Sequence, residues 1–429
     1  MVRFNTVHMQ ALPLSEPPLA EFYAAFHELP GRVAASDNQV TFPLEGEQVL
    51  SGRIWGPFRS YGGPQWSGCG GRRLLVRHLD PVGLPRPITS AIDKLRPPQA
   101  DSPRKRLPMT RHVFDNDFAA TREHREQFAR DGFVKLPGFL NANAVRMLLD
   151  RVDGDPTGGT DAFKVDRAGL YKRALYDFGE AKTNIFELLE RPYFRQALTD
   201  LTGCDLFLTQ ENSFEIEKNV HRAAPWHVGV QSFGYQCAEE FGCTIWAPLH
   251  PIDANGQRGG MTYVSEEILS GDFAYAVDLA FVEAIRARHR AGKPTTPADY
   301  YELRTGPLNA PAMSELLEAN ETEDDFVPGD VLLFNKNVIH RGRMLGEGEL
   351  DRRAAYVMRF VGADSRYDLS RARTLEFPTE QYPSVAKPVT RLHIEIAEAG
   401  AEHGDLLAEC AYFDDRERRT IRRPGAGRG

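Results

Sequence analysis

The chain has 429 residues, of which 41% are hydrophobic, 26% charged and 10% aromatic, and its formal net charge is −8. This composition excludes a disordered chain, a fibrous repeat and a small disulfide-stapled domain. The negative charge also argues against a chain-wide nucleic-acid binder, and the absence of any run of about 18 apolar residues argues against a membrane-spanning helix. The first residues lack the pattern of a cleaved signal, so the sequence predicts a cytoplasmic protein.

Residues 1–110 are predicted to form an N-terminal accessory region. Residues 38–54 alternate apolar and polar side chains, which is typical of short strands. Residues 81–108 are rich in proline and in charged residues, which indicates a linker or an extended arm. We therefore place a domain boundary at about residue 110.

Residues 111–365 are predicted to form a mainly β core with helices packed outside it, in a barrel or jelly roll. The expected helices are 114–130 and 142–152, and the expected strands are 133–136, 206–216, 242–249, 261–264, 331–334 and 354–361. Several short strands separated by turn residues are typical of such folds.

Residues 266–325 interrupt the strand pattern with helical periodicity at 273–289 and 312–319. This stretch is long for a connection, and we expect an insertion over one mouth of the core that is either a lid or a packing decoration. Residues 366–429 are predicted to be a C-terminal helical extension. Its basic end, 416–429, is expected to be solvated and frayed.

Two histidines and a later arginine are the residues with the clearest chemical potential. His227 lies in a Pro-Trp-His-Val-Gly segment, and His340 ends the segment that begins with the strand 331–334. Two neutral imidazoles on rigid strands can hold a divalent transition metal, and a third ligand is commonly found two residues after the first histidine, because positions i and i+2 share a strand face. An arginine on a following strand can bind a carboxylate co-substrate through its planar guanidinium.

Five segments occur in a fixed order along the chain: DGFVKLPGFL, PWHVG, TIWAPLHPIDANGQRGGMTYVSEE, PGDVLLFNKNVIH and RRAAYVMRF. Over roughly residues 115–365 this order resembles the phytanoyl-CoA dioxygenase-like family of Fe(II)/2-oxoglutarate-dependent oxygenases. The resemblance implies a double-stranded β-helix (cupin-like) core and an oxidoreductase that uses iron, 2-oxoglutarate and O₂. It also implies that His227 and His340 bind the iron.

The family resemblance further implies that an arginine after the distal histidine anchors 2-oxoglutarate. Counting back from Phe360, Arg353 takes that place, Arg352 is the neighbouring alternative, and Arg359 alternates onto the same strand face as Arg353. Gln210 and Asn212 lie on an earlier predicted strand, where they can hydrogen-bond the co-substrate or a metal-bound water, or serve only structural partners.

The chain departs from the family pattern at Gly229. The family has His-x-Asp with the aspartate as third iron ligand, whereas glycine has no side chain with which to coordinate. The change resembles the signature of iron/2-oxoglutarate halogenases, in which chloride or bromide takes the position and the charge of the missing carboxylate. The leading hypothesis is therefore a halogenase that replaces an unactivated C–H bond by C–Cl or C–Br, with Gly229 making room for the halide.

Two alternatives stay open from the sequence. A carboxylate from elsewhere, such as Glu239, Glu240 or Asp253, can complete the metal site of an ordinary hydroxylase. A chain with a broken site can instead be a non-catalytic binding or assembly subunit.

The expected partner is a small-molecule substrate from secondary metabolism. A free substrate is favoured over a carrier-tethered one, because the acidic chain offers no basic dock for an acidic carrier apart from its tail. No nucleic acid and no membrane are expected as partners. Of the aromatic residues near the motifs, Trp246 is expected in the core, while Phe233 and Tyr235 are candidates for the halide or substrate side.

Overall fold

The computed structural model describes residues 7–9, 35–36, 39–43, 49–54, 111–154, 163–164, 169–176, 183–229, 232–383 and 387–423. Near the N-terminus, β1 (Val7–Met9), β2 (Ala35–Ser36), β3 (Gln39–Pro43) and β4 (Val49–Ile54) form an antiparallel sheet in the order β1-β4-β3-β2. Strands β3 and β4 lie within the predicted strand segment. The proline-rich segment 81–108 lies outside the described residues.

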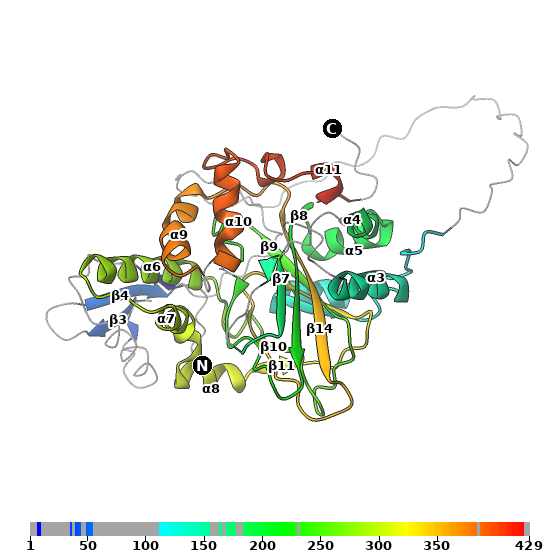
Figure 1. Cartoon of the computed structure of the whole chain (residues 1–429), viewed down its shortest axis with the longest axis horizontal. Helices are drawn as coiled ribbons and strands as arrows, with labels where there is room; N and C mark the ends of the chain where they lie inside the picture. Colours follow the sequence, from blue (N-terminus) through cyan, green and yellow to red (C-terminus); the bar gives the residue numbers. More distant parts are fainter. Residues whose placement is uncertain are drawn as a thin grey trace, which may run out of the picture. The chain divides into compact units, whose positions relative to one another are not determined.

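The larger sheet of the core is antiparallel, and its strand order is β5-β12-β9-β14-β8-β7-β6. Its strands are β5 (Phe133–Leu136), β6 (Phe163–Lys164), β7 (Arg173–Tyr176), β8 (Leu206–Glu217), β9 (Gly242–Pro248), β12 (Val331–Asn335) and β14 (Arg352–Gly362). The long strands β8 and β14 pair along almost their whole length, with one register shift after Arg359 (Figure 1).

The smaller sheet has the order β11-β10-β13 and faces the larger one. It consists of β10 (Met261–Val264), β11 (Glu321–Glu323) and β13 (Ile339–Gly342), and an isolated bridge between His227 and His340 adds the segment that carries His227. From β8 to β14 the chain passes back and forth between the two sheets. This arrangement is a double-stranded β-helix with flanking helices, and it confirms the predicted fold class.

Helices cover the outer face of the larger sheet: α2 (Arg122–Asp131), α3 (Ala142–Asp153), α4 (Thr183–Leu189) and α5 (Pro192–Thr202). Alternation along β14 separates two environments, because neighbouring side chains point to opposite faces. Tyr356, Met358 and Phe360 pack in the main hydrophobic core, whereas Ala355 and Val357 belong to a second core cluster between the sheets. The side chains that precede and follow this second set are Arg353 and Arg359.

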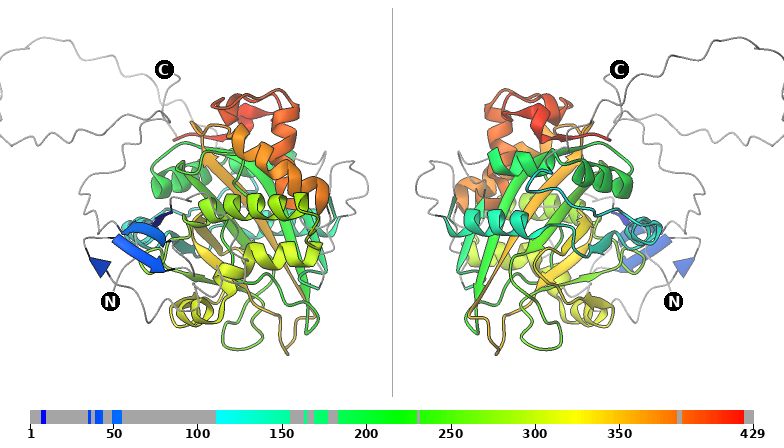
Figure 2. Two further views of the ribbon diagram at one scale, coloured as in Figure 1. Left: turned by 90° about the vertical axis from the view of Figure 1, so that its left-hand side faces the viewer. Right: turned by 90° about the vertical axis from the view of Figure 1, so that its right-hand side faces the viewer.

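Three helices make up the insertion after β10: α6 (Ala274–Arg290), α7 (Pro297–Asn309) and α8 (Pro311–Glu318). The sequence predicted α6 and α8 but not α7. At the C-terminal end, α9 (Leu369–Gln381) packs on α10 (Lys387–Glu398) and on α6, and η3 (Leu407–Glu409) follows (Figures 1 and 2).

The prediction of a frayed basic tail is wrong for residues 416–423. The chain forms α11 (Arg416–Arg419) and then β15 (Thr420–Ile421), which pairs with β8 at the edge of the larger sheet. Arg419 is buried and donates a hydrogen bond to the carbonyl of Leu208 at 3.2 Å. The tail folds because its arginines find backbone carbonyls and acidic partners such as Glu190, rather than water alone.

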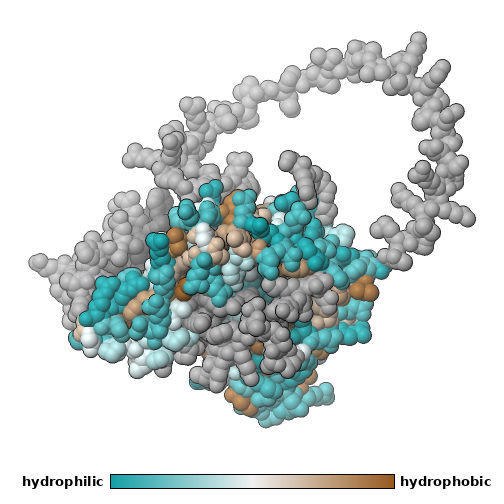
Figure 3. Space-filling model, turned by 45° about the horizontal axis from the view of Figure 1, so that its top comes forward, coloured by the Kyte–Doolittle hydropathy of each residue, from teal (hydrophilic) through white to brown (hydrophobic). Residues whose placement is uncertain are grey.

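The face turned forward in Figure 3 is mostly hydrophilic, with small scattered hydrophobic spots. Within the described ranges, no helix is both long and apolar enough to span a membrane.

Candidate active site

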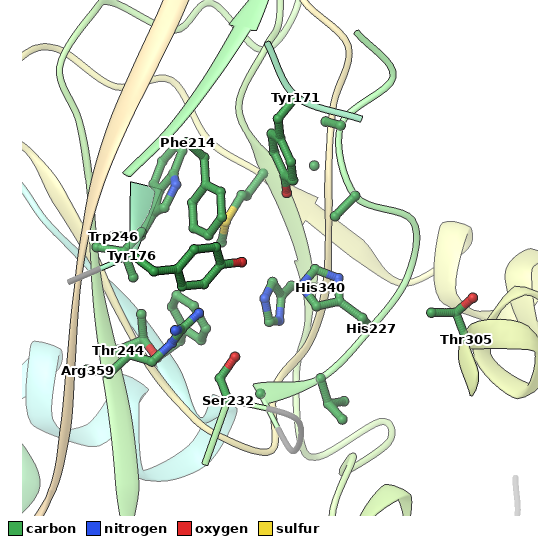
Figure 4. A pocket seen from close by; sticks show the side chains of 18 of the residues that line it. Tyr171, Tyr176, Phe214, His227, Ser232, Thr244, Trp246, Thr305, His340 and Arg359 are labelled. Atoms are coloured by element: carbon green, nitrogen blue, oxygen red, sulfur yellow. The ribbon is translucent and has the colours of Figure 1, made fainter. Parts of the chain in front are cut away.

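His227 and His340 lie side by side at the centre of a cavity between the two sheets (Figure 4). Their backbones pair directly, since each residue's N–H donates to the other's carbonyl at 2.9 Å. The two ring centroids are 4.2 Å apart and the rings are tilted by 51°. Two residues more than 100 positions apart in sequence are thus fixed by paired backbone hydrogen bonds, which is the rigid mounting that a metal site needs.

The hydrogen bonds of the two imidazoles define which ring nitrogen can bind a metal. Nδ1 of His227 lies 2.7 Å from the carbonyl of Pro225, and Nδ1 of His340 lies 2.8 Å from the carbonyl of Val338. A carbonyl oxygen only accepts, so both Nδ1 atoms carry a proton, and Nε2 is the nitrogen that each ring has left to bind a metal. Burial, together with the neighbouring His227 and Arg359, lowers the pKa of His340 well below its usual range and keeps the ring neutral.

Among the described residues, no cluster of three or more His, Cys, Asp or Glu side chains is arranged to hold a metal ion. Two of the carboxylates considered from the sequence have other roles. Glu240 accepts a hydrogen bond from the backbone of Arg366 at 2.7 Å, and Asp253 accepts from the backbone of Gly256 at 2.8 Å in its own turn. Glu239 is exposed and does not line the cavity. The geometry therefore gives no support to a carboxylate that completes the histidine pair.

Gly229 lines the same cavity, and the space beside it has little room for a side chain. A Cβ atom at this position would lie 2.9 Å from the carbonyl oxygen of Lys336 and 3.2 Å from the ring of Phe233. Gly229 also donates its N–H to that same carbonyl at 3.0 Å, which draws the two backbones together. The close approach of two backbones, rather than an unusual φ angle, is what requires glycine here.

Arg353 is the second residue of β14, and its buried, charged side chain reaches the cavity. Its side chain is 3% exposed, its Nε donates to the carbonyl of Gly259, and its guanidinium lies 5.7 Å from the centroid of the Trp246 ring. Among the described residues no carboxylate forms an ion pair with it, and burial lowers its pKa to about 10. A buried guanidinium in this setting is suited to an anionic ligand.

Arg352, the sequence alternative to Arg353, points to the other side of the strand. It binds Asp153 with two hydrogen bonds of 2.7 and 2.8 Å, on the helical side of the sheet. The strand alternation thus separates the two arginines, and the geometry favours Arg353 as the ligand-binding one.

Arg359 also lines the cavity, on the same face of β14 as Arg353. Its Nη1 donates to the side-chain oxygen of Gln210. When the Asn212 amide is turned so that its oxygen faces Arg359, the same Nη1 also donates to that oxygen at 2.5 Å. Gln210 and Asn212 do not themselves line the cavity, so they support Arg359 rather than reach a ligand. Six residues of strand span about 20 Å, so the backbone positions of Arg353 and Arg359 lie towards opposite ends of the cavity.

Aromatic side chains form one wall of the cavity, and the sequence did not identify most of them. Tyr171 precedes β7, Tyr176 is its last residue, and Phe214 lies on β8. The ring centroid of Phe214 is 5.0 Å from that of Tyr171 and 5.9 Å from that of Tyr176. Figure 4 shows both tyrosine hydroxyls directed towards the histidine pair. No motif or periodicity marks these tyrosines in the sequence, because only the pairing of β7 with β8 brings them to the site.

Three other aromatic expectations have mixed outcomes. Trp246 is 3% exposed, as expected of a core residue, and it also lines the cavity. Phe233 and Tyr235 are fully buried in a cluster with the C-terminal helices and do not line the cavity. The suggestion that Tyr235 faces the halide or substrate is therefore wrong, because α9 and α10 cover it. The ring of Phe233 packs with the same helices, but it also lies beside Gly229.

Comparison with known proteins gives similarity at the level of the fold. No family model and no curated protein matches the chain. Among solved structures, the non-heme alpha-ketoglutarate-dependent carbocyclase SnoK is 15% identical, with a TM-score of 0.39 over 58% of this chain and 86% of that one. The epimerase SnoN, in complex with Fe³⁺ and alpha-ketoglutarate, is 17% identical, with a TM-score of 0.39 over 57% and 84%. EctD from S. alaskensis, with 2-oxoglutarate and 5-hydroxyectoine, is 13% identical, with a TM-score of 0.40 over 59% and 80%.

Proposed function

We propose that the chain is a non-haem Fe(II)/2-oxoglutarate-dependent halogenase that converts an aliphatic C–H bond of a small molecule into C–Cl or C–Br. One observation carries the proposal: two imidazoles with paired backbones share a cavity with a buried arginine, while the place of a third protein ligand is taken by a glycine. A Cβ at position 229 would lie too close to the Lys336 carbonyl, which supports the view that the local backbone excludes a carboxylate side chain here.

The residues present fit the proposed ligands. The acceptor Nε2 atoms of His227 and His340 are the atoms that would hold Fe(II). Arg353, a buried cation between Gly259 and Trp246, would bind the distal carboxylate of 2-oxoglutarate. Iron with 2-oxoglutarate and O₂ would supply the oxidising chemistry that breaks a C–H bond.

The charges of the cavity favour a small anion at the open metal position. Its lining contains two arginines and two histidines but no aspartate or glutamate among the described residues. An aspartate ligand would bring one negative charge, and a halide brings the same charge without a side chain. Tyr171, Tyr176 and Phe214 form an aromatic wall of the same cavity.

The test is an anaerobic titration of the full chain with Fe(II) and 2-oxoglutarate, with and without chloride or bromide, followed by visible absorption. We expect a metal-to-ligand charge-transfer band that shifts when halide is added. His227→Ala and His340→Ala are expected to show no band. A band that ignores halide would favour the hydroxylase alternative, and no band in the unmodified chain would favour the non-catalytic one.

The insertion also contributes to the histidine site, and this gives a prediction for Asn309 at the end of α7. Its side-chain oxygen accepts from the N–H of Trp226 at 3.0 Å, and its Nδ2 donates to the carbonyl of Trp226 at 2.8 Å. Because Trp226 precedes His227, Asn309→Ala is expected to weaken Fe(II) binding by about 10-fold, as loss of a supporting residue commonly does. Asn309→Asp keeps the acceptor but sets a carboxylate oxygen against the carbonyls of Trp226 and Thr305, so it should lose at least as much.

The measurement is the Fe(II) dissociation constant of each variant in the presence of 2-oxoglutarate. Asn320→Ala is the matched control, since Asn320 makes a comparable helix-end hydrogen bond to Leu316 on the exposed end of α8. Equal affinities for Asn309→Ala and Asn320→Ala would show that Asn309 does not position His227.

A further inference from the structure

A second cavity lies between the insertion and the segment that carries His227. Helix α6 contributes Phe273, Ala274 and Val277 to its walls, and α7 contributes Pro307 and Leu308. These five side chains and Val228 form the apolar part of the wall, while the polar part consists of His227, Asp278, Arg304 and Thr305.

The second cavity adjoins the first around the histidine site. Both are lined by the same three residues, His227, Val228 and Thr305. Thr305 projects from α7 on the far side of His227 from the aromatic wall (Figure 4). A single elongated molecule can therefore occupy both cavities with its middle next to His227.

Two charged side chains, Arg304 and Asp278, line the end of the second cavity, and they pair with each other. Arg304 binds Asp278 through two hydrogen bonds, one of them 2.8 Å from Nη2 to Oδ2, and both side chains are almost fully buried. Arg371 donates to the same carboxylate at 3.2 Å. Because these partners are already engaged, breaking them to bind a charged ligand would leave a buried charge uncompensated. The chemistry of this cavity therefore selects for an uncharged group.

The walls are fixed rather than loosely packed. Asn309 holds the end of α7 to Trp226 through both of its side-chain hydrogen bonds. Trp226, Val228 and Leu308 belong to one buried hydrophobic cluster, which also includes Tyr275 of α6. A cavity with such supported walls exists before a ligand arrives, which reduces the cost of binding.

We propose that the cavity beneath α6 and α7 is the subsite for an uncharged, apolar part of the substrate, such as an alkyl chain or a ring. The proposal rests on the proposed function, because it places the reacting carbon where the two cavities adjoin, next to His227. It assigns the insertion a role in substrate selection, rather than one of packing alone.

The test uses toluene as the probe, with benzoate and benzylamine as ring-matched charged probes, observed by ligand-detected NMR on the full metal-free chain. Ala274→Phe fills the subsite from α6, whereas Ala276→Phe adds the same ring on the exposed face of that helix. We expect toluene to bind the unmodified chain and Ala276→Phe and to lose binding to Ala274→Phe. Ala274→Leu, a smaller filling substitution, should give an intermediate loss.

Three results would overturn the subsite: equal toluene binding by Ala274→Phe and Ala276→Phe, stronger binding of either charged probe in the subsite, or no toluene binding at all. The halide titration of the same variants separates this failure from a failure of the proposed function. If toluene binds and Ala274→Phe removes that binding, but no charge-transfer band forms, the subsite stands and the iron chemistry is rejected. If a halide-sensitive band forms but toluene does not bind, the iron chemistry stands and the subsite is rejected.

Discussion

Replacing Gly229 by aspartate is expected to abolish halogenation without producing an efficient hydroxylase. The new Cβ would lie 2.9 Å from the Lys336 carbonyl, closer than side-chain carbons approach an oxygen in ordinary packing. Lys336 cannot easily retreat, because its N–H donates to Gly242 at 2.8 Å and its Nζ donates to Ala238 at 2.8 Å. The carboxylate would therefore displace halide by its charge, while the backbone shift would misplace it as a ligand.

The measurement is the halide-dependent shift of the Fe(II)/2-oxoglutarate band, which needs no knowledge of the substrate. Gly229→Ala is the matched control, since it adds the Cβ without the charge. We expect Gly229→Ala to lose about 1–3 kcal/mol of stability through overpacking and to keep some response to halide. A halide shift that persists unchanged in Gly229→Asp would reject the halide site at this position.

The strands that carry the larger sheet could be predicted because their own residues determine them. Strands β9, β12 and β14 are apolar over most of their length, and β8 has apolar residues at both ends of a polar run. The structure places each of the four within two residues of its predicted bounds. Strand β13 was not predicted, since Ile339–Gly342 has only four residues, two of which are polar or charged. Its strand conformation comes from pairing with β10 and with His227.

Helix α7 and the aromatic wall show a second limit of sequence reasoning. Helix α7 contains Pro307, which favours a helix end, and only the packing of the insertion carries the helix on to Asn309. Tyr171 and Tyr176 have no sequence pattern that links them to His340. The two histidines and Arg353 could be predicted because the motifs that contain them occur in the same order along the chain as in the family. The residues that shape the cavity could not, because only three-dimensional contacts bring them together.

Arg353→Met is expected to weaken 2-oxoglutarate binding by about 100-fold while leaving the fold as stable as before, or more stable. Truncating the cationic partner of a buried carboxylate typically costs about 2–5 kcal/mol of binding. In the ligand-free chain, however, the same charge is a liability, because burial lowers the pKa of Arg353 to about 10 from 12.5. A folded-state pKa below the unfolded one means that the charge of Arg353 destabilises the fold across the neutral range, and methionine removes that cost while it still covers Trp246.

Opposite signs for binding and stability distinguish a ligand-binding arginine from a structural one, which would lose both together. The measurements are the 2-oxoglutarate dissociation constant of the Fe(II) form and the thermal midpoint of the metal-free chain. Arg352→Met is the matched control one residue away, because its ion pair with Asp153 is about one-third exposed. Its contact with the buried Glu215 is longer, at 3.6 Å, and Lys172 and Arg173 remain as partners of that carboxylate. We therefore expect about 1 kcal/mol of lost stability and unchanged 2-oxoglutarate binding. If Arg353→Met unfolds the chain, or if Arg352→Met is the variant that loses 2-oxoglutarate, the buried cation is structural and the anchor lies elsewhere on β14.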